Sequence, residues 1–211
     1  MPRPVNADAA ATRQRILAAS LQLFSDQGVD GTSIRTIAGA SGVSLAMVHH
    51  YFGSKQALHK ACTDSMYAEM YGLREQLEQA LRRGGPPQRL VEGVVRDAWR
   101  FARDHQVAMR LLMRSVMTAG ELGADYRERA QEPFLQEVPA ALAGLLGRPV
   151  GDLRLSLQSI VNILVRYAIS TERELALFTG IENDPDGAER AVADHLVRAA
   201  RALLGIPAAQ E

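Results

Sequence analysis

The sequence predicts an all-α protein, and three observations carry that prediction. Apolar residues recur at three- and four-residue spacing along most of the chain, beginning with Ile16, Leu17, Leu21 and Phe24. No stretch alternates apolar and polar residues for long enough to form a half-buried β-strand. Glycine and proline interrupt the helical pattern at intervals of helix length, so that about nine helices are expected.

Three short or medium helices are expected near the N-terminus. After a flexible arm at residues 1–11, they cover residues 12–28, 34–40 and 45–50. Thr32 or Ser33 can cap the second helix and Ser44 the third, because short hydroxyl side chains accept hydrogen bonds from free backbone N–H groups. Gly53 ends the third helix, and Ser54 can cap the next one.

Longer helices are expected in the rest of the chain. They cover residues 55–83, 88–104, 106–119, 126–146, 152–178 and 188–204. Pro133 and Pro139 are expected to kink or break the helix at 126–146, because proline lacks a backbone N–H group. The sequence is therefore divided into a domain at residues 1–54 and a domain at residues 55–211.

The composition is that of a folded globular protein. Hydrophobic residues make up 47% and charged residues 23% of the chain, which excludes the disordered and fibrous classes. No apolar run reaches the roughly eighteen residues that a membrane span needs, and residues 1–11 lack the apolar stretch of a signal peptide. A cytoplasmic location is expected, and the single cysteine, Cys62, agrees with a reducing compartment.

Positive charge is concentrated at the N-terminal end. Residues 1–60 contain six lysine or arginine residues and three acidic residues, although the whole chain has a net charge of zero. A basic N-terminal end on an acidic remainder favours a protein that presents this end to phosphate groups.

The segment from Thr32 to Lys55 has the pattern of a helix-turn-helix. The two short helices of this motif cross closely, so a small residue is needed at the crossing and a residue that tolerates positive φ is needed in the turn. Ala38 and Gly42 meet these needs. The apolar residues expected to face the first helix are Ile34, Ile37, Val43 and Val48. The residues left on the outward side of the second helix are Ser44, Leu45, Ala46, Met47, His49 and His50.

These residues resemble the DNA-binding domain of the TetR family of regulators. The residues that carry the resemblance are Ala38, Gly42-Val43-Ser44, Tyr51-Phe52 and Ser54-Lys55, within a match over residues 12–60. The resemblance implies an N-terminal helix-turn-helix domain joined by a long helix to a C-terminal helical domain for ligand binding and dimerisation. It also implies a homodimeric repressor, without a cofactor or enzymatic activity, that binds a palindromic double-stranded DNA operator and is released by a small-molecule effector.

Two positions depart from the family pattern. His49 stands where the family usually has tyrosine, and Leu45 follows Ser44 where a basic or polar residue is common. Leu45, Ala46 and Met47 can offer only apolar contacts, for instance to thymine methyl groups. Arg35 is expected to contact a guanine and Lys55 a phosphate. The complete set of expected DNA contacts is Thr32, Arg35, Ser44, Leu45, Ala46, Met47, His49, His50, Tyr51 and Lys55.

A ligand cavity is expected among the middle helices, as the resemblance implies. The expected lining is Tyr67, Met70, Tyr71, Trp99, His105, Met109, Met113, Met117, Phe134, Asn162 and Arg166. Methionines four residues apart would make a deformable surface, and the polar groups would orient the ligand. The alternative is that these residues are ordinary core.

The last two long helices are expected to pair with a second subunit. Their expected contacts are Leu157, Ile160, Val161, Leu164, Ala188, Val192, His195, Leu196 and Ala199. Small residues at helical spacing allow close helix approach, but the same stripes are also compatible with the internal core of one subunit. Arg166 can instead form an ion pair between subunits.

Three other interpretations remain open. His49, His50, His59 and Cys62 lie close in sequence, but without the spacing of a metal site. The chain has no glycine-rich phosphate loop or nucleophile elbow that would indicate an enzyme. The main alternative function is a helical small-molecule-binding or protein-binding module whose DNA binding is weak or lost, because the outward side of the second motif helix offers few hydrogen-bonding groups.

Overall fold

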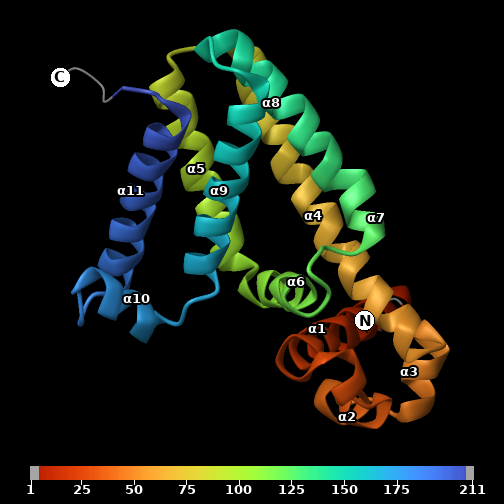
Figure 1. Ribbon diagram of the computed structural model, residues 1–211. Coiled ribbons are helices and arrows are strands. Elements are labelled where there is room, and N and C mark those ends of the chain that lie inside the picture. The colour runs from red at the N-terminus through yellow and green to blue at the C-terminus, as the bar shows by residue number, and fades with distance from the viewer. Residues whose placement is uncertain (1–4, 208–211) are drawn as a thin grey trace. The chain divides into compact units, whose positions relative to one another are not determined.

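The computed structural model describes the backbone of residues 5–207, in which all regular structure is helical (Figure 1). Side chains are described from residue 8 onward, except at positions 66, 69, 73, 74, 76, 77, 80 and 81. Residues 5–207 form eleven α-helices and one π-helical turn. The predicted all-α class is confirmed, and the predicted number of about nine helices was too low. None of the helices in the described part is long and apolar enough to cross a membrane.

The chain divides into two compact units. The first contains residues 1–69 and 110–122, and the second contains residues 70–109 and 123–211. Two helices, α4 (Lys55–Arg83) and α6 (Gln106–Ala119), therefore contribute residues to both units. The domain division expected at residue 54 falls at the beginning of α4.

The first unit begins with a longer helix than the sequence predicts. Helix α1 (Val5–Gly31) starts seven residues before Thr12. Residues 5–11 are therefore helical, and the prediction of a flexible arm is wrong for these residues. Ala9, Ala10 and Ala11 explain the extension, since alanine has the highest helix propensity. Residues 1–4 of that arm, with Arg3, lie outside the described residues. Within α1 the backbone is non-helical at Gly28.

Helix α2 (Ile34–Ser41) packs on α1 and on α3 (Leu45–Phe52), and the three helices share one apolar core. Three helices of the N-terminal segment supply Ile16, Phe24, Ile37 and Val48, all essentially inaccessible to water. The core is completed from α4 and α6 by Leu58, Cys62 and Leu111. Burial of large apolar side chains from every helix fixes how α2 and α3 stand on this unit.

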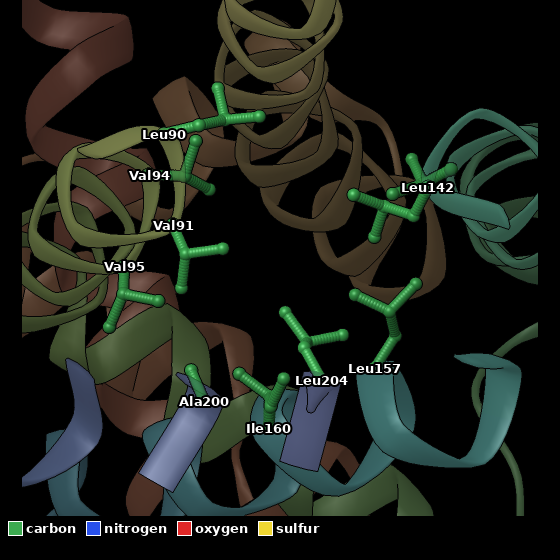
Figure 2. Close-up of a pocket in the computed structure, with 10 residues that line it drawn as sticks. Leu90, Val91, Val94, Val95, Leu142, Leu157, Ile160, Ala200 and Leu204 are labelled. Atoms are coloured by element: carbon green, nitrogen blue, oxygen red, sulfur yellow. The ribbon is translucent and has the colours of Figure 1, made fainter. Parts of the chain in front are cut away.

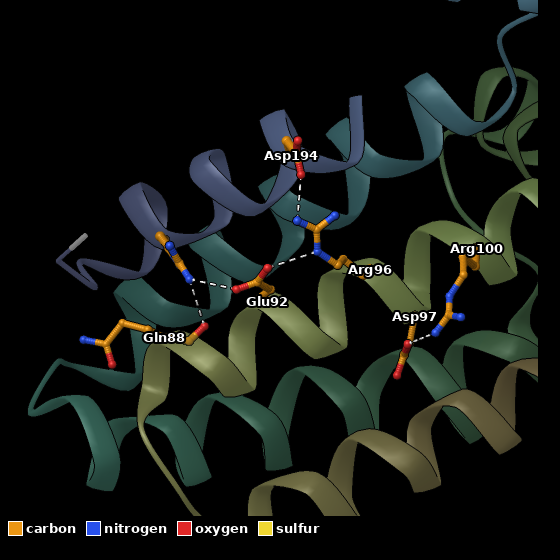
Figure 3. A network of polar contacts seen from close by, with 7 residues as sticks. Gln88, Glu92, Arg96, Asp97, Arg100 and Asp194 are labelled. Atoms are coloured by element: carbon orange, nitrogen blue, oxygen red, sulfur yellow. Dashed lines mark hydrogen bonds and ion pairs between the residues drawn. The ribbon is translucent and has the colours of Figure 1, made fainter. Parts of the chain in front are cut away.

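The second unit is built from α5 (Pro87–Asp104), α8 (Glu132–Leu146), α9 (Val150–Ala168), α10 (Glu172–Thr179) and α11 (Pro185–Leu204). Helix α9 packs on α5, α8 and α11, and α11 packs on α5. Charged side chains reinforce the contact between α5 and α11 (Figure 3). Arg96 donates to Asp194 at 2.6 Å and to Glu92 at 3.2 Å, and Glu92 also accepts from Arg201 at 3.3 Å.

The prolines of the segment at 126–146 do not break the helix. Helix α7 (Ala124–Tyr126) continues through a π-helical turn (Arg127–Gln131) into α8, and Pro139 lies inside α8. In the π turn the N–H of Glu132 donates to the carbonyl of Arg127, five residues earlier. This widening occurs next to Pro133, whose ring and missing N–H group disfavour the ordinary four-residue ladder.

The prediction of a single long helix at 152–178 is wrong, because α9 ends at Ala168 and α10 begins at Glu172. Thr171 is the cause. Its Oγ1 accepts a hydrogen bond from the N–H of Glu174 at 3.2 Å, which starts a new helix. The sequence Thr-x-x-Glu at 171–174 is a capping-box pattern that sequence analysis overlooked.

Candidate functional site

The helix-turn-helix is defined by caps at both ends of its turn. Ser33 Oγ accepts from the N–H of Thr36 and begins α2, and Gly42 ends α2 in the left-handed conformation at φ 67°. Ser44 Oγ then accepts from the N–H of Met47 at 3.2 Å and begins α3. The N–H of Val43 donates to Ala38 across the turn at 3.1 Å. These bonds satisfy free backbone groups of both helices, so local chemistry sets where α3 starts.

Helix α3 turns one face into the core and leaves the other open. Val48 is buried, and Tyr51 and Phe52 are half-buried against the core. The six residues expected to point outward are all exposed, namely Ser44, Leu45, Ala46, Met47, His49 and His50. Leu45 is 46% and Met47 38% exposed, and with the exposed Ala46 they give α3 an apolar first turn that is open to a partner.

Thr32 does not offer its side chain to a partner. It is buried, and its Oγ1 donates to the carbonyl of Gly28 at 2.7 Å. The hydroxyl therefore completes the end of α1, while Ser33 caps α2. The expected DNA contact through the Thr32 side chain is wrong for this reason.

The imidazole of His49 is partly committed within the chain. Its Nδ1 lies 2.8 Å from the carbonyl oxygen of Gly53, which can only accept a hydrogen bond. Nδ1 therefore carries the proton, and in the neutral ring Nε2 is an acceptor. Donation to a phosphate from Nε2 requires the protonated ring. His50 lies edge-on to the ring of Tyr51 at 5.4 Å.

Two basic side chains flank α3. Arg35 is exposed in the first turn of α2, on the same motif as α3. Lys55 opens α4 and is half-buried, and its Nζ donates to the carbonyl of Thr32 at 3.2 Å. Ser54 Oγ caps the same helix end by accepting from the N–H of Ala57 at 3.1 Å. Helix ends of this kind favour anions, and Lys55 adds a full positive charge there.

A third basic side chain packs on the motif. The guanidinium of Arg13 lies 5.3 Å from the centre of the Phe52 ring, a cation–π contact between α1 and α3. Phe52 is thus a packing residue.

The end of α1 contacts α6 inside the first unit. Gly28 has φ 77° and ψ 169°, a conformation open almost only to glycine. A side-chain carbon at this position would lie 2.9 Å from Nε of Arg114. Arg114 Nη1 in turn lies 3.4 Å from the carbonyl of Asp26, and Leu111 of the same helix belongs to the core of this unit.

Burial changes the acidity of two groups in the first unit. It lowers the pKa of His59, whose ring lies edge-on to Phe24 at 5.4 Å. It raises the pKa of the Cys62 thiol to about 12 despite the positive charge of Arg13. At neutral pH both groups are therefore uncharged in the folded chain.

The second unit contains an apolar cavity of about 70 Å³ (Figure 2). It is lined by aliphatic side chains of α5, α8, α9 and α11 and is partly open to solvent. Its lining is Leu90, Val91, Val94, Val95, Val138, Leu142, Leu157, Ile160, Ala200 and Leu204. No lining residue carries a polar side chain, so the cavity suits hydrocarbon and offers no side-chain hydrogen bond.

None of the residues expected to line a ligand cavity borders this one. Trp99 and Met109 are buried, whereas Tyr67, Met70, Tyr71, His105, Met113 and Phe134 are half-buried. Met117 is 83% exposed, because residues four apart advance by about 40° per step and Met117 has left the buried face of Met109.

Two polar residues expected in the cavity are on the surface. Asn162 is exposed and accepts from Gln158 at 2.9 Å, and Arg166 is paired with Glu174 of its own chain at 2.8 Å. This ion pair raises the pKa of Arg166 and lowers the pKa of Glu174.

Most residues expected at a subunit interface are core of the second unit. The buried ones are Leu157, Leu164, Ala188, Val192 and Leu196. They face neighbouring helices of the same chain, so they cannot supply the first contacts to another chain. Ile160 and Ala199 are half-buried, and Val161 and His195 are exposed. Large exposed apolar residues that the sequence analysis did not select follow nearby, at Leu177 and Phe178 of α10.

The beginning of α6 depends on contacts that are distant in sequence. Arg103, at the end of α5, donates to the carbonyls of Ala168 and Ser170 at 3.0 and 2.8 Å and to Glu189 at 2.6 Å. Gln106, the first residue of α6, donates to the same two carbonyls at 2.8 Å each. Nothing in the local sequence marks carbonyl groups more than sixty residues away.

The known proteins that this chain resembles in sequence and in structure are transcriptional regulators. The model for bacterial regulatory proteins of the tetR family matches residues 16–62, which include α2 and α3. The chain is similar to the HTH-type transcriptional regulatory protein RaaS of Mycobacterium tuberculosis, at 35% identity over 51% of this chain and 46% of that protein. It is also similar to the HTH-type transcriptional regulator BetI of Rhizobium meliloti, at 33% identity over 42% of each chain. These matches span less than half of either relative.

A solved structure resembles nearly the whole chain. It is a TetR-like transcriptional regulator from Rhodococcus sp. RHA1, with 25% identity and a TM-score of 0.64 over 97% of this chain and 99% of that one. The likeness thus extends beyond the N-terminal unit to the helical remainder.

Proposed function

We propose that this chain, which belongs to the TetR family of bacterial regulatory proteins, represses transcription by binding a palindromic operator as a homodimer, and that a small-molecule effector releases it. The observation that carries the proposal is the open face of α3, held on a well-packed helix-turn-helix. A helix presented in this way enters the major groove with its N-terminal residues at the base edges. The protein then acts in the cytoplasm, where chromosomal DNA lies.

The surroundings of α3 support binding to DNA. Arg35 is the side chain best suited to a base, because a guanidinium donates two parallel hydrogen bonds to guanine. Ser44 caps α3, His50 lies on its exposed side and Lys55 begins α4, and we propose that these three side chains contact phosphate groups. His49 joins them when its ring is protonated.

Dimerisation follows from family membership and from exposed apolar residues of α9 and α10. Val161 and Phe178 are the residues we propose at the interface, with His195 of α11 beside them. Tyr167 joins this group by packing edge-on to both Phe178 and His195, at 5.9 Å each. A two-fold dimer places two α3 helices about 34–36 Å apart on one face of the duplex, which requires a palindromic site.

The effector is proposed to act in the second unit. The aliphatic cavity favours an apolar ligand, and its volume of about 70 Å³ is smaller than the 150 Å³ cavity that accepts benzene in another protein. A ligand larger than a short alkyl segment must therefore extend out of the cavity or move the surrounding helices apart. Helices α4 and α6 contribute residues to both units, so they are the elements we propose to transmit such a movement.

A coupling of about 1–3 kcal/mol between the two sites is enough for release. The effector must bind the conformation that does not bind DNA more tightly, because a ligand with equal affinity for both conformations shifts nothing. A small molecule that binds the chain without changing its operator affinity would not be the effector.

The test is selection of genomic fragments with the purified protein, followed by binding to the selected site over a range of salt concentrations. A palindrome is expected, with log affinity falling linearly as log salt rises. Arg35→Ala is expected to relax specificity at one base pair of each half-site, and Lys55→Ala to weaken all sites and reduce the salt slope by about two, one for each subunit. Lys60→Ala is the matched control, since Lys60 is exposed on α4 and pairs with Asp64 at 2.8 Å.

The alternative function, a binding module that does not use DNA, is favoured by the three apolar residues at the start of α3. It predicts that no fragment is enriched above random DNA at physiological salt. That outcome would overturn the proposed function.

A further inference from the structure

We propose that α3 reads its operator through methyl groups in the major groove, chiefly those of thymine, with Leu45 and Met47 as the specificity-determining residues. This inference rests on the proposed function, since it names the chemical feature that the same face recognises. It does not follow from the helix-turn-helix itself, which leaves the chemistry of the face open.

The first turn of α3 carries no side-chain hydrogen-bonding group. Its first three residues are Leu45, Ala46 and Met47, and all three are exposed. These are the positions from which a recognition helix reaches base edges. In the major groove each base edge presents hydrogen-bonding groups, and thymine alone among the four standard bases adds a methyl group. Leu45 and Met47 can discriminate bases only through that methyl group.

The nearest polar groups on the helix are partly committed within the chain. Ser44 Oγ accepts from the N–H of Met47, and His49 Nδ1 is bonded to the carbonyl of Gly53. His49 and His50 also lie one turn further along α3, beyond the residues that enter the groove first. Arg35 comes from α2, so the hydrogen-bonding and apolar contacts of this motif have separate sources.

The two large side chains stand apart from each other on the helix. Leu45 and Met47 are two residues apart, about 200° around the axis, with the small Ala46 between them. They can therefore contact different base steps, while Ala46 lets the helix backbone approach the groove closely. Burial of their exposed carbon surface against methyl groups supplies the free energy of discrimination.

The size of the effect follows from the burial of one methyl-sized group. We expect replacement of a contacted thymine by uracil, which removes only the methyl group, to weaken binding about fourfold. The same change in both half-sites of a palindrome is expected to weaken binding by about fifteenfold. Replacement of cytosine by 5-methylcytosine at a contacted position is expected to strengthen binding by a similar factor, because the methyl group occupies the same place in the groove.

The experiment measures the affinity of the full-length protein for the selected operator with single thymines changed to uracil, or with single cytosines changed to 5-methylcytosine. Leu45→Ala is expected to remove the thymine–uracil difference at one position of each half-site and to keep it elsewhere, and Met47→Ala at another. The matched control is Leu145→Ala on α8, which is 44% exposed against 46% for Leu45 and is expected to keep every difference.

Two results would overturn the proposal while leaving sequence-specific binding intact. One is equal affinity for thymine and uracil at every half-site position. The other is that both Leu45→Ala and Met47→Ala keep the thymine–uracil difference at every position where the parent protein shows it, because the differences would then come from DNA shape. Absence of any selected site would instead overturn the proposed function, and this inference with it.

Discussion

Substitution of Gly28 by alanine is expected to destabilise the first unit through the backbone. With φ 77° and ψ 169°, Gly28 occupies a region that is strained for every residue with a Cβ atom. The strain costs about 1–3 kcal/mol. The new carbon would also lie 2.9 Å from Arg114 Nε, but the guanidinium ends a flexible side chain and can withdraw.

The same substitution at Gly39 is the matched control and has the opposite sign. Gly39 lies inside α2, and no heavy atom would lie within 4 Å of the added carbon. Alanine in a helix interior is favoured over glycine by about 0.5–1 kcal/mol. Gly28→Ala is thus expected to lower, and Gly39→Ala to raise, the free energy of unfolding.

Urea unfolding followed by far-ultraviolet circular dichroism measures both changes, with Arg114→Ala added to complete a double-mutant cycle. Backbone strain predicts that Arg114→Ala does not rescue Gly28→Ala. The reasoning is refuted if Gly28→Ala is as stable as the parent chain. Rescue by Arg114→Ala would show that the clash, and not the backbone, is the cause.

Three further predictions concern buried polar groups. Arg103→Met is expected to destabilise the second unit by about 2–4 kcal/mol, because the Arg103 side chain is only 14% exposed and donates hydrogen bonds to Glu189 and to two carbonyl groups. Arg100→Met is the control, since the Arg100 side chain is 74% exposed and its loss is expected to cost under about 1 kcal/mol. Thermal unfolding of the two variants measures the difference. Burial lowers the pKa of His59 from 6.5, so the fold is stabilised by the neutral ring above pH 6.5 and loses this stability as the pH falls below that value. His59→Phe is therefore expected to flatten the dependence of the urea midpoint on pH between pH 5 and 8. An unchanged dependence would contradict this prediction. A thiol with a pKa of about 12 is expected to resist a disulfide reagent at pH 8 until urea unfolds the chain, so rapid labelling of native Cys62 would contradict the burial argument.

Local signals predicted the N-terminal motif well. The capping serines, Gly42 and the alternation of Val48 with exposed neighbours are all set within a few residues, and the structure has α2 and α3 within two residues of the expected bounds. Family resemblance was carried by the same residues. The DNA contact expected of the Thr32 side chain was wrong because Thr32 and Ser33 both carry a hydroxyl group next to α2. Only the packing of the folded chain decides that Thr32 is the buried one.

The second unit was less predictable because its contacts are distant in sequence. Leu157 and Leu196 have the spacing of an interface stripe, but other helices of the same chain cover them. A stripe of apolar residues shows that a face is covered and does not show by what. The cavity is lined by residues from four helices, so no single helix pattern could identify it. The break at Thr171 was predictable in principle from its capping box.

The most direct test of the account compares the affinity of the protein for its selected operator with its affinity for a scrambled duplex of the same length and composition, at one physiological salt concentration. A repressor that reads base edges with α3 and Arg35 is expected to prefer the operator by roughly a thousandfold or more. A ratio close to one would contradict the claim that this chain recognises a DNA sequence.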